Sequence, residues 1–178
     1  NAYVGGIVGK ALNVVENCEN TSTGVVIVQH SGSNGKYALA GGIAGRSQGT
    51  ATIKNCVNNG TVKAIVNTTN NLTGAGGITG YPNQMTLIGN VNNGYVYAEN
   101  NHTSTGRVYA GGICGTDGEN ATIVNSSFDS TYAFGSVNNG GGAIMVNGNF
   151  TSIEKSNFTN THADNNHEAR GGAIYIKG

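Results

Sequence analysis

The sequence predicts an all-β fold, a parallel β-helix (solenoid) in which short strands of successive rungs stack along one axis. Three observations predict it. Gly-Gly pairs return along the chain, beginning at residues 5, 41, 76, 111, 141 and 171, and a period of 20–50 residues is typical of stacked architectures. Short β-branched or aromatic runs such as GVVIV and AIYIK alternate with clusters of Gly, Asn and Ser, as strands and turns require. Gly and Asn, both weak helix formers, interrupt every window long enough for three helical turns.

The repeats divide into elements that recur in the same order. Their spacings of 36, 35, 35, 30 and 30 residues predict about five to six rungs of 30–36 residues. Each period begins with GGIxG or GGAI, continues with an aliphatic piece such as ATIKNC, and ends with a less regular piece such as GTVKA. We expect one β-helix segment over 1–178, with GGIxG-type repeats in 1–140 and GGAI-type repeats in 141–178. Because both ends lie within a repeat, we expect a fragment of a longer repeat protein.

The composition favours a polar but uncharged surface. Charged residues make up 10% of the 178 residues, against roughly 25% in typical domains. Nine basic and nine acidic residues cancel, so nothing indicates a nucleic-acid partner or an anionic membrane surface. The 27 Asn, 18 Thr and 11 Ser residues supply the polar groups instead. No run approaches the roughly 20 apolar residues of a membrane span, so we expect no membrane-spanning segment.

Two columns of aliphatic residues form the predicted core, because like side chains one rung apart shield each other from water. One column follows the Gly-Gly pair and the other lies in the aliphatic piece: Ile7, Ile43, Ile78 and Ile113, then Val15, Ile53, Leu87, Ile123 and Ile153. Two residues after the second column, Asn17, Asn55 and Asn125 predict a ladder of stacked amides, as found in stacked sheets. Ordinary turn asparagines are the alternative.

Three cysteines are present, and two of them occupy one column. Cys18 and Cys56 lie one rung apart, within reach of a disulfide. Stacked thiols that fill space as small apolar groups are the alternative, which we favour. Cys114 aligns with small residues of the other repeats and is expected to fill space.

Several surface features are candidates for modification or contact. Nine asparagines begin an N-x-S/T sequon, and they are candidate N-glycosylation sites, with unmodified turn residues as the alternative: Asn20, Asn59, Asn67, Asn71, Asn101, Asn120, Asn125, Asn149 and Asn157. Tyr95 and Tyr97 flank Val96 on one strand. If Val96 points inward, both rings face solvent and are available to a sugar or a partner protein; rings packed over a loop are the alternative.

No catalytic residue, metal or cofactor is predicted. His162, Asp164, His167 and Glu168 cluster in one segment, but their spacing matches no zinc signature, and a solvated loop is expected. Asp117 and Glu119 in TDGEN match no calcium-loop pattern.

The repeated sequence motifs resemble those of known families. GGIVG, GGIAG, GGITG and GGICG, each followed by an aliphatic strand, resemble the GLUG-type repeats of bacterial surface proteins and adhesins. GGAI at 141–144 and 171–174 resembles the repeats of polymorphic membrane proteins and archaeal adhesin-like proteins. The resemblance implies a right-handed β-helix, surface display and an adhesive or stalk-like role, and it implies no catalytic residue.

The leading functional hypothesis is a non-enzymatic structural and interaction module, a rigid rod in an extracellular surface adhesin or fibre. Its expected partners are other cell-surface proteins, glycans, or further copies along the rod. A polysaccharide lyase or hydrolase is an alternative, but it needs paired carboxylates, which the scattered Asp and Glu residues do not supply. An ice-binding β-helix is another. It rests on one column of hydroxyls: Thr52, Thr86, Thr122 and Ser152.

Overall fold

The computed structural model describes residues 1–31, 35–47, 49–67, 70–101, 107–112, 122–124, 126–128, 131–135, 139–140, 144–147, 152–165 and 174–177. Within these ranges the chain forms strands and turns and no helix, so the predicted all-β class is confirmed. It follows that the described residues include no helix of the length and apolar character needed to cross a membrane.

The strands run through five sheets in a fixed order, and each passage through them is here called a rung. Sheet I contains β1 (Ala2–Gly5), β6 (Gly35–Gly41), β11 (Asn70–Gly76), β15 (Arg107–Gly111) and β19 (Asn139–Gly140). Sheet II consists of two pairs, β2 (Val8–Ala11) with β7 (Ala44–Ser47) and β20 (Ile144–Asn147) with β24 (Ile174–Lys177). Sheet III contains β3 (Val14–Glu16), β8 (Thr52–Lys54), β12 (Thr86–Ile88), β16 (Thr122–Val124) and β21 (Ser152–Glu154).

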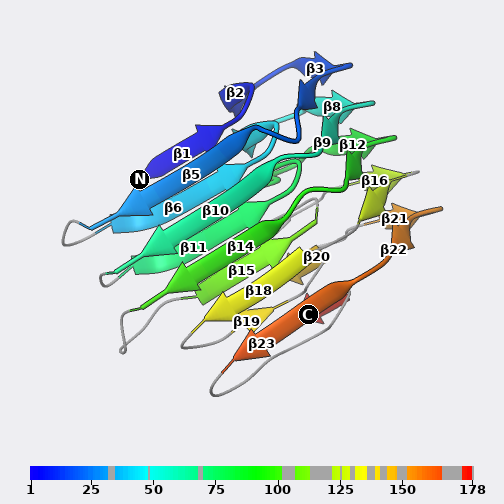
Figure 1. Cartoon of the computed structure of the whole chain (residues 1–178). Coiled ribbons are helices and arrows are strands. Elements are labelled where there is room, and N and C mark those ends of the chain that lie inside the picture. Colours follow the sequence, from blue (N-terminus) through cyan, green and yellow to red (C-terminus); the bar gives the residue numbers. More distant parts are fainter. Residues whose placement is uncertain are drawn as a thin grey trace.

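Two further sheets complete each rung. Sheet IV contains β4 (Glu19–Asn20), β9 (Val57–Asn58), β13 (Val91–Asn92), β17 (Ser127–Phe128) and β22 (Asn157–Phe158). Sheet V contains β5 (Val25–His30), β10 (Thr61–Val66), β14 (Val96–Asn100), β18 (Thr131–Gly135) and β23 (Thr161–Asn165). From β5 the chain returns to sheet I as β6, beside β1 (Figure 1).

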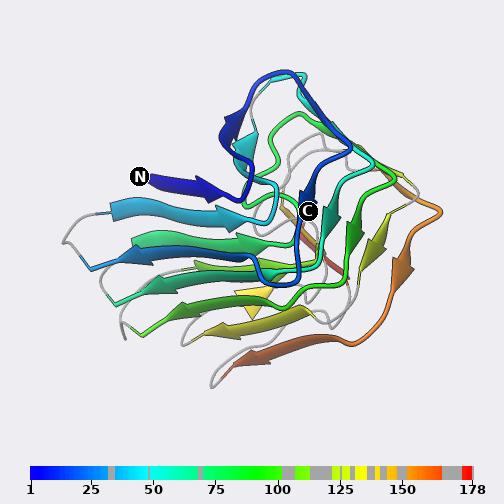
Figure 2. The ribbon, with the colours of Figure 1, turned by 45° about the horizontal axis from the view of Figure 1, so that its top comes forward.

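Equivalent strands of successive rungs pair in parallel, so each sheet extends from rung to rung along the molecule (Figure 2). Parallel strands lie about 4.8 Å apart, so each rung advances the chain by that distance. The arrangement is consistent with a parallel β-helix. The sequence predicted three strand pieces per period, whereas the structure has five, because corners divide two of the predicted pieces.

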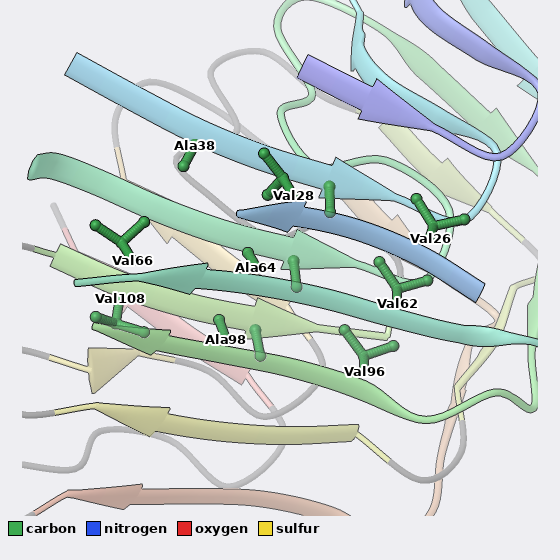
Figure 3. Packing of buried hydrophobic residues seen from close by; sticks show 12 residues of the cluster. Val26, Val28, Ala38, Val62, Ala64, Val66, Val96, Ala98 and Val108 are labelled. Carbon is green, nitrogen blue, oxygen red and sulfur yellow. The ribbon is translucent and has the colours of Figure 1, made fainter. Parts of the chain in front are cut away.

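Sheets I and V pack face to face through a thin core of small side chains (Figure 3). This core consists of Val and Ala residues that are at most 5% exposed, among them Val26, Val28, Ala38, Val62, Ala64, Val66, Val96, Ala98 and Val108. Strand β10 shows how the sequence encodes it, since Thr, Lys and Ile at the outward positions alternate with buried Val, Ala and Val. Inward and outward residues alternate because successive side chains of a strand point to opposite faces.

A second core lies behind sheet III and contains the predicted aliphatic columns. Val15, Ile53, Leu87, Ile123 and Ile153 pair in register from rung to rung. The three central members are fully buried, and the two outer members pack against the cluster that contains them.

The column that follows the Gly-Gly pairs also stacks in the structure. The backbone N–H of Ile7 donates to the carbonyl of Ile43, and that of Ile43 donates to the carbonyl of Ile78. Ile43 and Ile78 are fully buried, whereas Ile7 is 44% exposed. Ile113 lies outside the described residues.

The Gly-Gly pairs mark tight backbone contacts, both within a rung and between rungs. A Cβ added at Gly41 would overlap the carbonyl oxygen of Ala44 across the turn. One at Gly42 would overlap the carbonyl oxygen of Gly77 in the next rung and lie 2.6 Å from Asn58 Oδ1. Only glycine fits both positions, which explains why the pair returns in every period.

The predicted amide ladder requires a correction. Asn17 and Asn55 have exposed side chains that make no hydrogen bond to each other, and Asn125 lies outside the described residues. Asn17 and Asn55 have φ of 54° and 52°, and Gly89 and Lys155, which interrupt the series, have φ of 62° and 48°. The corner between sheets III and IV therefore requires the left-handed backbone conformation, which Gly and Asn adopt most readily.

A true amide ladder lies three residues further along each rung, inside the molecule. Asn20 Nδ2 donates to Asn58 Oδ1, and Asn58 Nδ2 donates to Asn92 Oδ1, both at 2.7 Å. The second N–H of Asn58 and of Asn92 donates to the carbonyls of Gly60 and Gly94. These three asparagines are at most 8% exposed. The ladder thus satisfies buried polar groups while fixing the register between rungs.

Replacing Gly42 with alanine is expected to destabilise the fold strongly. The new methyl group would force apart the backbone of two rungs, at a cost of roughly 3 kcal/mol or more. Thermal unfolding should shift downward by roughly 6–12 °C for a chain of this size. Gly9→Ala is the matched control. Gly9 lies in the equivalent GGIxG motif of the preceding repeat, and its Cβ would meet nothing closer than Tyr3 O at 3.4 Å. Equal melting temperatures for the two variants would contradict the assigned contact.

Replacing Asn58 with alanine is expected to lower the free energy of unfolding by roughly 2–4 kcal/mol. The change removes the acceptor for Asn20 and the donor to Asn92 inside the protein. Asn59→Ala is the control, since Asn59 bonds to Glu19 and Asn93 at the surface and should cost less than about 1 kcal/mol. Urea titrations measure both. A smaller loss for Asn58→Ala than for Asn59→Ala would show that the interior ladder is not a stabilising element.

Candidate contact surface

The outer face of sheet V carries a flat array of apolar and aromatic side chains. Val26, Val28, Val62 and Val96 point into the core, so their neighbours in sequence point outward. Among these, Val25 is 62% and Ile27 45% exposed. Single exposed apolar residues are ordinary, but several on one strand face make a contact surface.

Tyr95 and Tyr97 lie on this face, and the structure places them there together. Val96 between them is fully buried, and Tyr95 is 43% exposed. Their rings are stacked, with centroids 6.1 Å apart and planes 14° from parallel. Val96 therefore points inward, and Tyr95 and Tyr97 lie on the opposite face of the strand.

Neighbouring rungs extend the surface on both sides of Tyr97. Ile27, Lys63, Tyr97, Tyr132 and His162 occupy one register position in five successive strands of sheet V. Such a row has a spacing of about 4.8 Å between residues, similar from one end to the other. The face therefore repeats at the rung spacing, and its described side chains are of mixed aromatic, apolar and cationic character.

The sequon asparagines differ widely in accessibility. Asn20 is 8% exposed and donates to Asn58 in the interior ladder, so its amide is not accessible to a glycosyltransferase in the folded chain. Asn67, Asn101 and Asn157 are exposed, and Asn101 donates to Asn67 Oδ1 at 2.9 Å. Asn59 is partly exposed and bonds to Glu19.

The remaining sequons are only partly described. Asn71 belongs to β11, although its side chain lies outside the described part of the structure, as do Asn120, Asn125 and Asn149.

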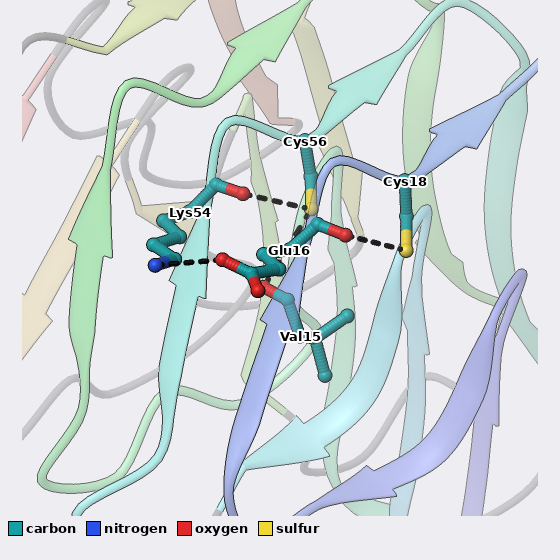
Figure 4. A network of polar contacts seen from close by, with 5 residues as sticks. All are labelled: Val15, Glu16, Cys18, Lys54 and Cys56. Carbon is teal, nitrogen blue, oxygen red and sulfur yellow. Dashed lines mark hydrogen bonds and ion pairs between the residues drawn. The ribbon is translucent and has the colours of Figure 1, made fainter.

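The corner between sheets III and IV holds the two described cysteines, and both are free thiols (Figure 4). Cys18 Sγ donates to the Glu16 carbonyl at 3.2 Å, and Cys56 Sγ donates to the Lys54 carbonyl at 3.4 Å. Beside them Lys54 and Glu16 form an ion pair of 2.6 Å at the surface. Burial raises the pKa of the Cys56 thiol above its ordinary value. Cys56 therefore packs as a protonated filler rather than as a nucleophile.

Serines close the same corner in later rungs. Ser126 Oγ donates to the Val124 carbonyl, and Ser156 Oγ donates to the Glu154 carbonyl. Each of these bonds bridges the single residue at the corner, which has a positive φ where it is described. The serine hydroxyls therefore perform the same structural task as the cysteine thiols.

No group of three or more His, Cys, Asp or Glu residues that could hold a metal ion occurs in the described ranges. His162 is exposed on β23, whereas His167, Glu168, Asp117 and Glu119 lie outside those ranges.

The hydroxyl column considered for ice binding does stand in register on sheet III, as Thr52, Thr86, Thr122 and Ser152. The parallel row two residues further on contains Lys54, Ile88, Val124 and Glu154. The array is therefore one column wide.

A pocket between sheets I and II was not predicted. It is lined by Tyr3, Tyr37, Leu39, Arg46 and Tyr81. A signal existed in the residue after GGIxG, which is Lys10, Arg46 and Tyr81 in three successive repeats. Nothing in the sequence alone, however, brings tyrosines from β1 and β6 to the same place.

Comparison with known proteins identifies one repeat. The model of the GLUG motif matches residues 37–63, which run from β6 through β7, β8 and β9 into β10. The matched segment therefore makes one circuit from sheet I to sheet V and supports a GLUG-type β-helical repeat. No curated protein and no solved structure matches the chain.

Cys56 is expected to resist thiol reagents in the folded chain. In a Cys114→Ser background, the partly exposed Cys18 should react at pH 8, while Cys56 should react at least roughly tenfold more slowly. Because its pKa is raised, the thiolate fraction of Cys56 should grow only above the pH at which ordinary thiols ionise, near 8.5. Mass spectrometry after timed alkylation measures the two rates separately. Equal rates would contradict the buried, protonated state.

Proposed function

We propose that the chain is a segment of a right-handed parallel β-helix, with five to six rungs, that serves as a non-enzymatic structural and interaction module of an extracellular surface protein. The observation that carries the proposal is the parallel, in-register pairing of equivalent strands across five sheets. The match to the GLUG motif over one such circuit adds to it. A rod of this kind displays or adheres, in the manner of surface adhesins and fibres.

The right-handed sense rests on a general rule for parallel strands. Connections from one parallel strand to the next in the same sheet are right-handed in about 98% of cases, because of the twist of the strands. The rule applies to sheets I, III, IV and V, in which strands of successive rungs pair in parallel and are joined by the rest of the rung. The same pairing supports treating 1–178 as one segment, with GGAI-type repeats in 141–178 continuing the stack.

The contact surface on sheet V supplies the interaction. Tyr95 and Tyr97 present stacked rings beside Lys63 and the exposed Ile27. Aromatic rings of this kind bind the apolar faces of sugars and the side chains of partner proteins. We therefore propose glycans or other cell-surface proteins as ligands, and cell-surface localisation.

Three of the described carboxylates favour the non-enzymatic reading. Glu16 is paired with Lys54, and Glu19 accepts from Asn59. Glu154 stands in the same row as Glu16 but four rungs away, about 19 Å. Glycoside hydrolysis uses carboxyl groups about 5–9.5 Å apart.

The experiment is binding to an array of defined glycans and to purified cell-surface proteins, with the wild-type chain and the Tyr95→Ala/Tyr97→Ala variant. We expect binding that falls at least tenfold in the double variant, with a melting temperature within about 3 °C of wild type, because both rings lie at the surface. Val14→Ala is the control, since Val14 is 58% exposed on sheet III. Absence of any ligand would contradict the adhesive role, and release of new reducing or unsaturated ends from uronate polymers would contradict the non-enzymatic one.

A further inference from the structure

The pocket between sheets I and II combines aromatic walls with a cation whose hydrogen-bonding capacity is only partly used. Tyr3 comes from β1, Tyr37 and Leu39 come from β6, and Arg46 comes from β7. Tyr81, in the segment after the third Gly-Gly pair, completes the lining. The cavity between these side chains has a volume of about 40 Å³ and is partly open to solvent.

The Arg46 guanidinium is held in place by the tyrosines. Its central carbon lies 5.2 Å from the ring centre of Tyr3 and 5.5 Å from that of Tyr81. Its Nη1 donates to the Tyr3 hydroxyl at 3.2 Å. Tyr37 lies against Tyr81, with ring centroids 6.4 Å apart and planes tilted by 52°. The guanidinium is thus oriented before any ligand arrives, which lowers the entropic cost of binding.

One edge of this guanidinium has no partner. Arg46 Nε is buried and has no acceptor among the described residues. Arg46 forms no ion pair with a described carboxylate, whereas Lys54 pairs with Glu16. An unpaired buried N–H is costly, and a guanidinium fork with a free Nε matches the two oxygens of a carboxylate.

A second cation stands beside the first. Lys10 pairs in register with Arg46 between β2 and β7, and it is exposed. Two positive charges at neighbouring positions without a described carboxylate repel each other, and an anion bound between them removes that repulsion. The charge of the site therefore selects an anionic ligand.

We propose that this pocket binds the carboxylate of an acidic sugar residue, a uronate unit within a polysaccharide. Arg46 pairs with the carboxylate through its Nε edge, Lys10 adds long-range attraction, and the rings of Tyr37 and Tyr81 contact the apolar face of the sugar. The enclosed space is far smaller than the roughly 300–1,000 Å³ of sites for drug-sized molecules, so it admits the carboxylate group while the sugar ring lies at its opening. This inference is independent of the contact surface on sheet V.

The test is titration calorimetry of the whole chain with trigalacturonate, its methyl ester and neutral galactotriose. Binding is expected for the free acid, with a loss of at least tenfold for the ester and for the neutral sugar. Arg46→Gln should weaken binding of the free acid at least tenfold. Arg46→Lys keeps the charge without the fork and should still weaken it several-fold. Lys54→Gln, which removes a cation on sheet III, should leave the affinity unchanged.

Several results would overturn the proposal. Failure of the free acid to bind, or equally good binding of galactotriose, contradicts an acidic-sugar site. An affinity left unchanged by Arg46→Gln and Arg46→Lys, with melting curves that show both variants folded, contradicts the role of Arg46. A short peptide with a free C-terminal carboxylate that binds more tightly than trigalacturonate, and loses affinity in Arg46→Gln, would replace the acidic sugar with a peptide ligand. Tyr95→Ala/Tyr97→Ala should retain full uronate binding, which separates a failure at this pocket from a failure of the surface on sheet V.

Discussion

The spacing of about 4.8 Å between hydrogen-bonded parallel strands is the constraint on which this molecule depends. Every rung must repeat the path of its neighbour at that distance, so each inward side chain must fit against its own counterpart. Aliphatic residues meet this requirement in the column of Ile53, Leu87 and Ile123. Asparagines meet it inside the molecule, where the Asn58 amide accepts from Asn20 and donates to Asn92 along the axis. Gly42 meets it by having no side chain, since the next rung occupies the space.

Sequence repetition predicted the parts of the fold that this constraint controls. The all-β class and the register of the aliphatic column follow from period and side-chain type, because a shift of one residue would turn buried Ile53 to solvent. The asparagine columns show the limit of the same reasoning. Asn17 and Asn58 each belong to a column in which asparagine returns in several periods. The sequence does not distinguish a column that needs a backbone conformation from one that needs an amide side chain. The positive φ of Lys155 at the equivalent corner shows that the backbone was the common property.

The candidate sites were predicted only where they lie on one strand. Tyr95 and Tyr97 were found because alternation around Val96 is a local property. The pocket around Arg46 joins residues from β1, β6 and β7 with Tyr81, which are far apart in the sequence and lie on the outer faces of two sheets. Outer faces are free of the stacking requirement, so they vary from rung to rung. The proposed contact sites lie on these outer faces, and repetition does not reveal them. The interior ladder also changes along the axis, since Phe128 and Phe158 follow Asn92 in register.

Distance measurement between two spin labels tests the stacked architecture most directly. Val14 and Ser152 are 138 residues apart in sequence but occupy one register column on the outside of sheet III, four rungs apart. Labels attached to cysteines at these positions, with the three native cysteines replaced by serine, should give a single narrow distance distribution centred near 20 Å, since four rungs span about 19 Å. A broad distribution, or a maximum beyond about 35 Å, would contradict the stacking of rungs and with it the account of core, corners and surfaces built on it.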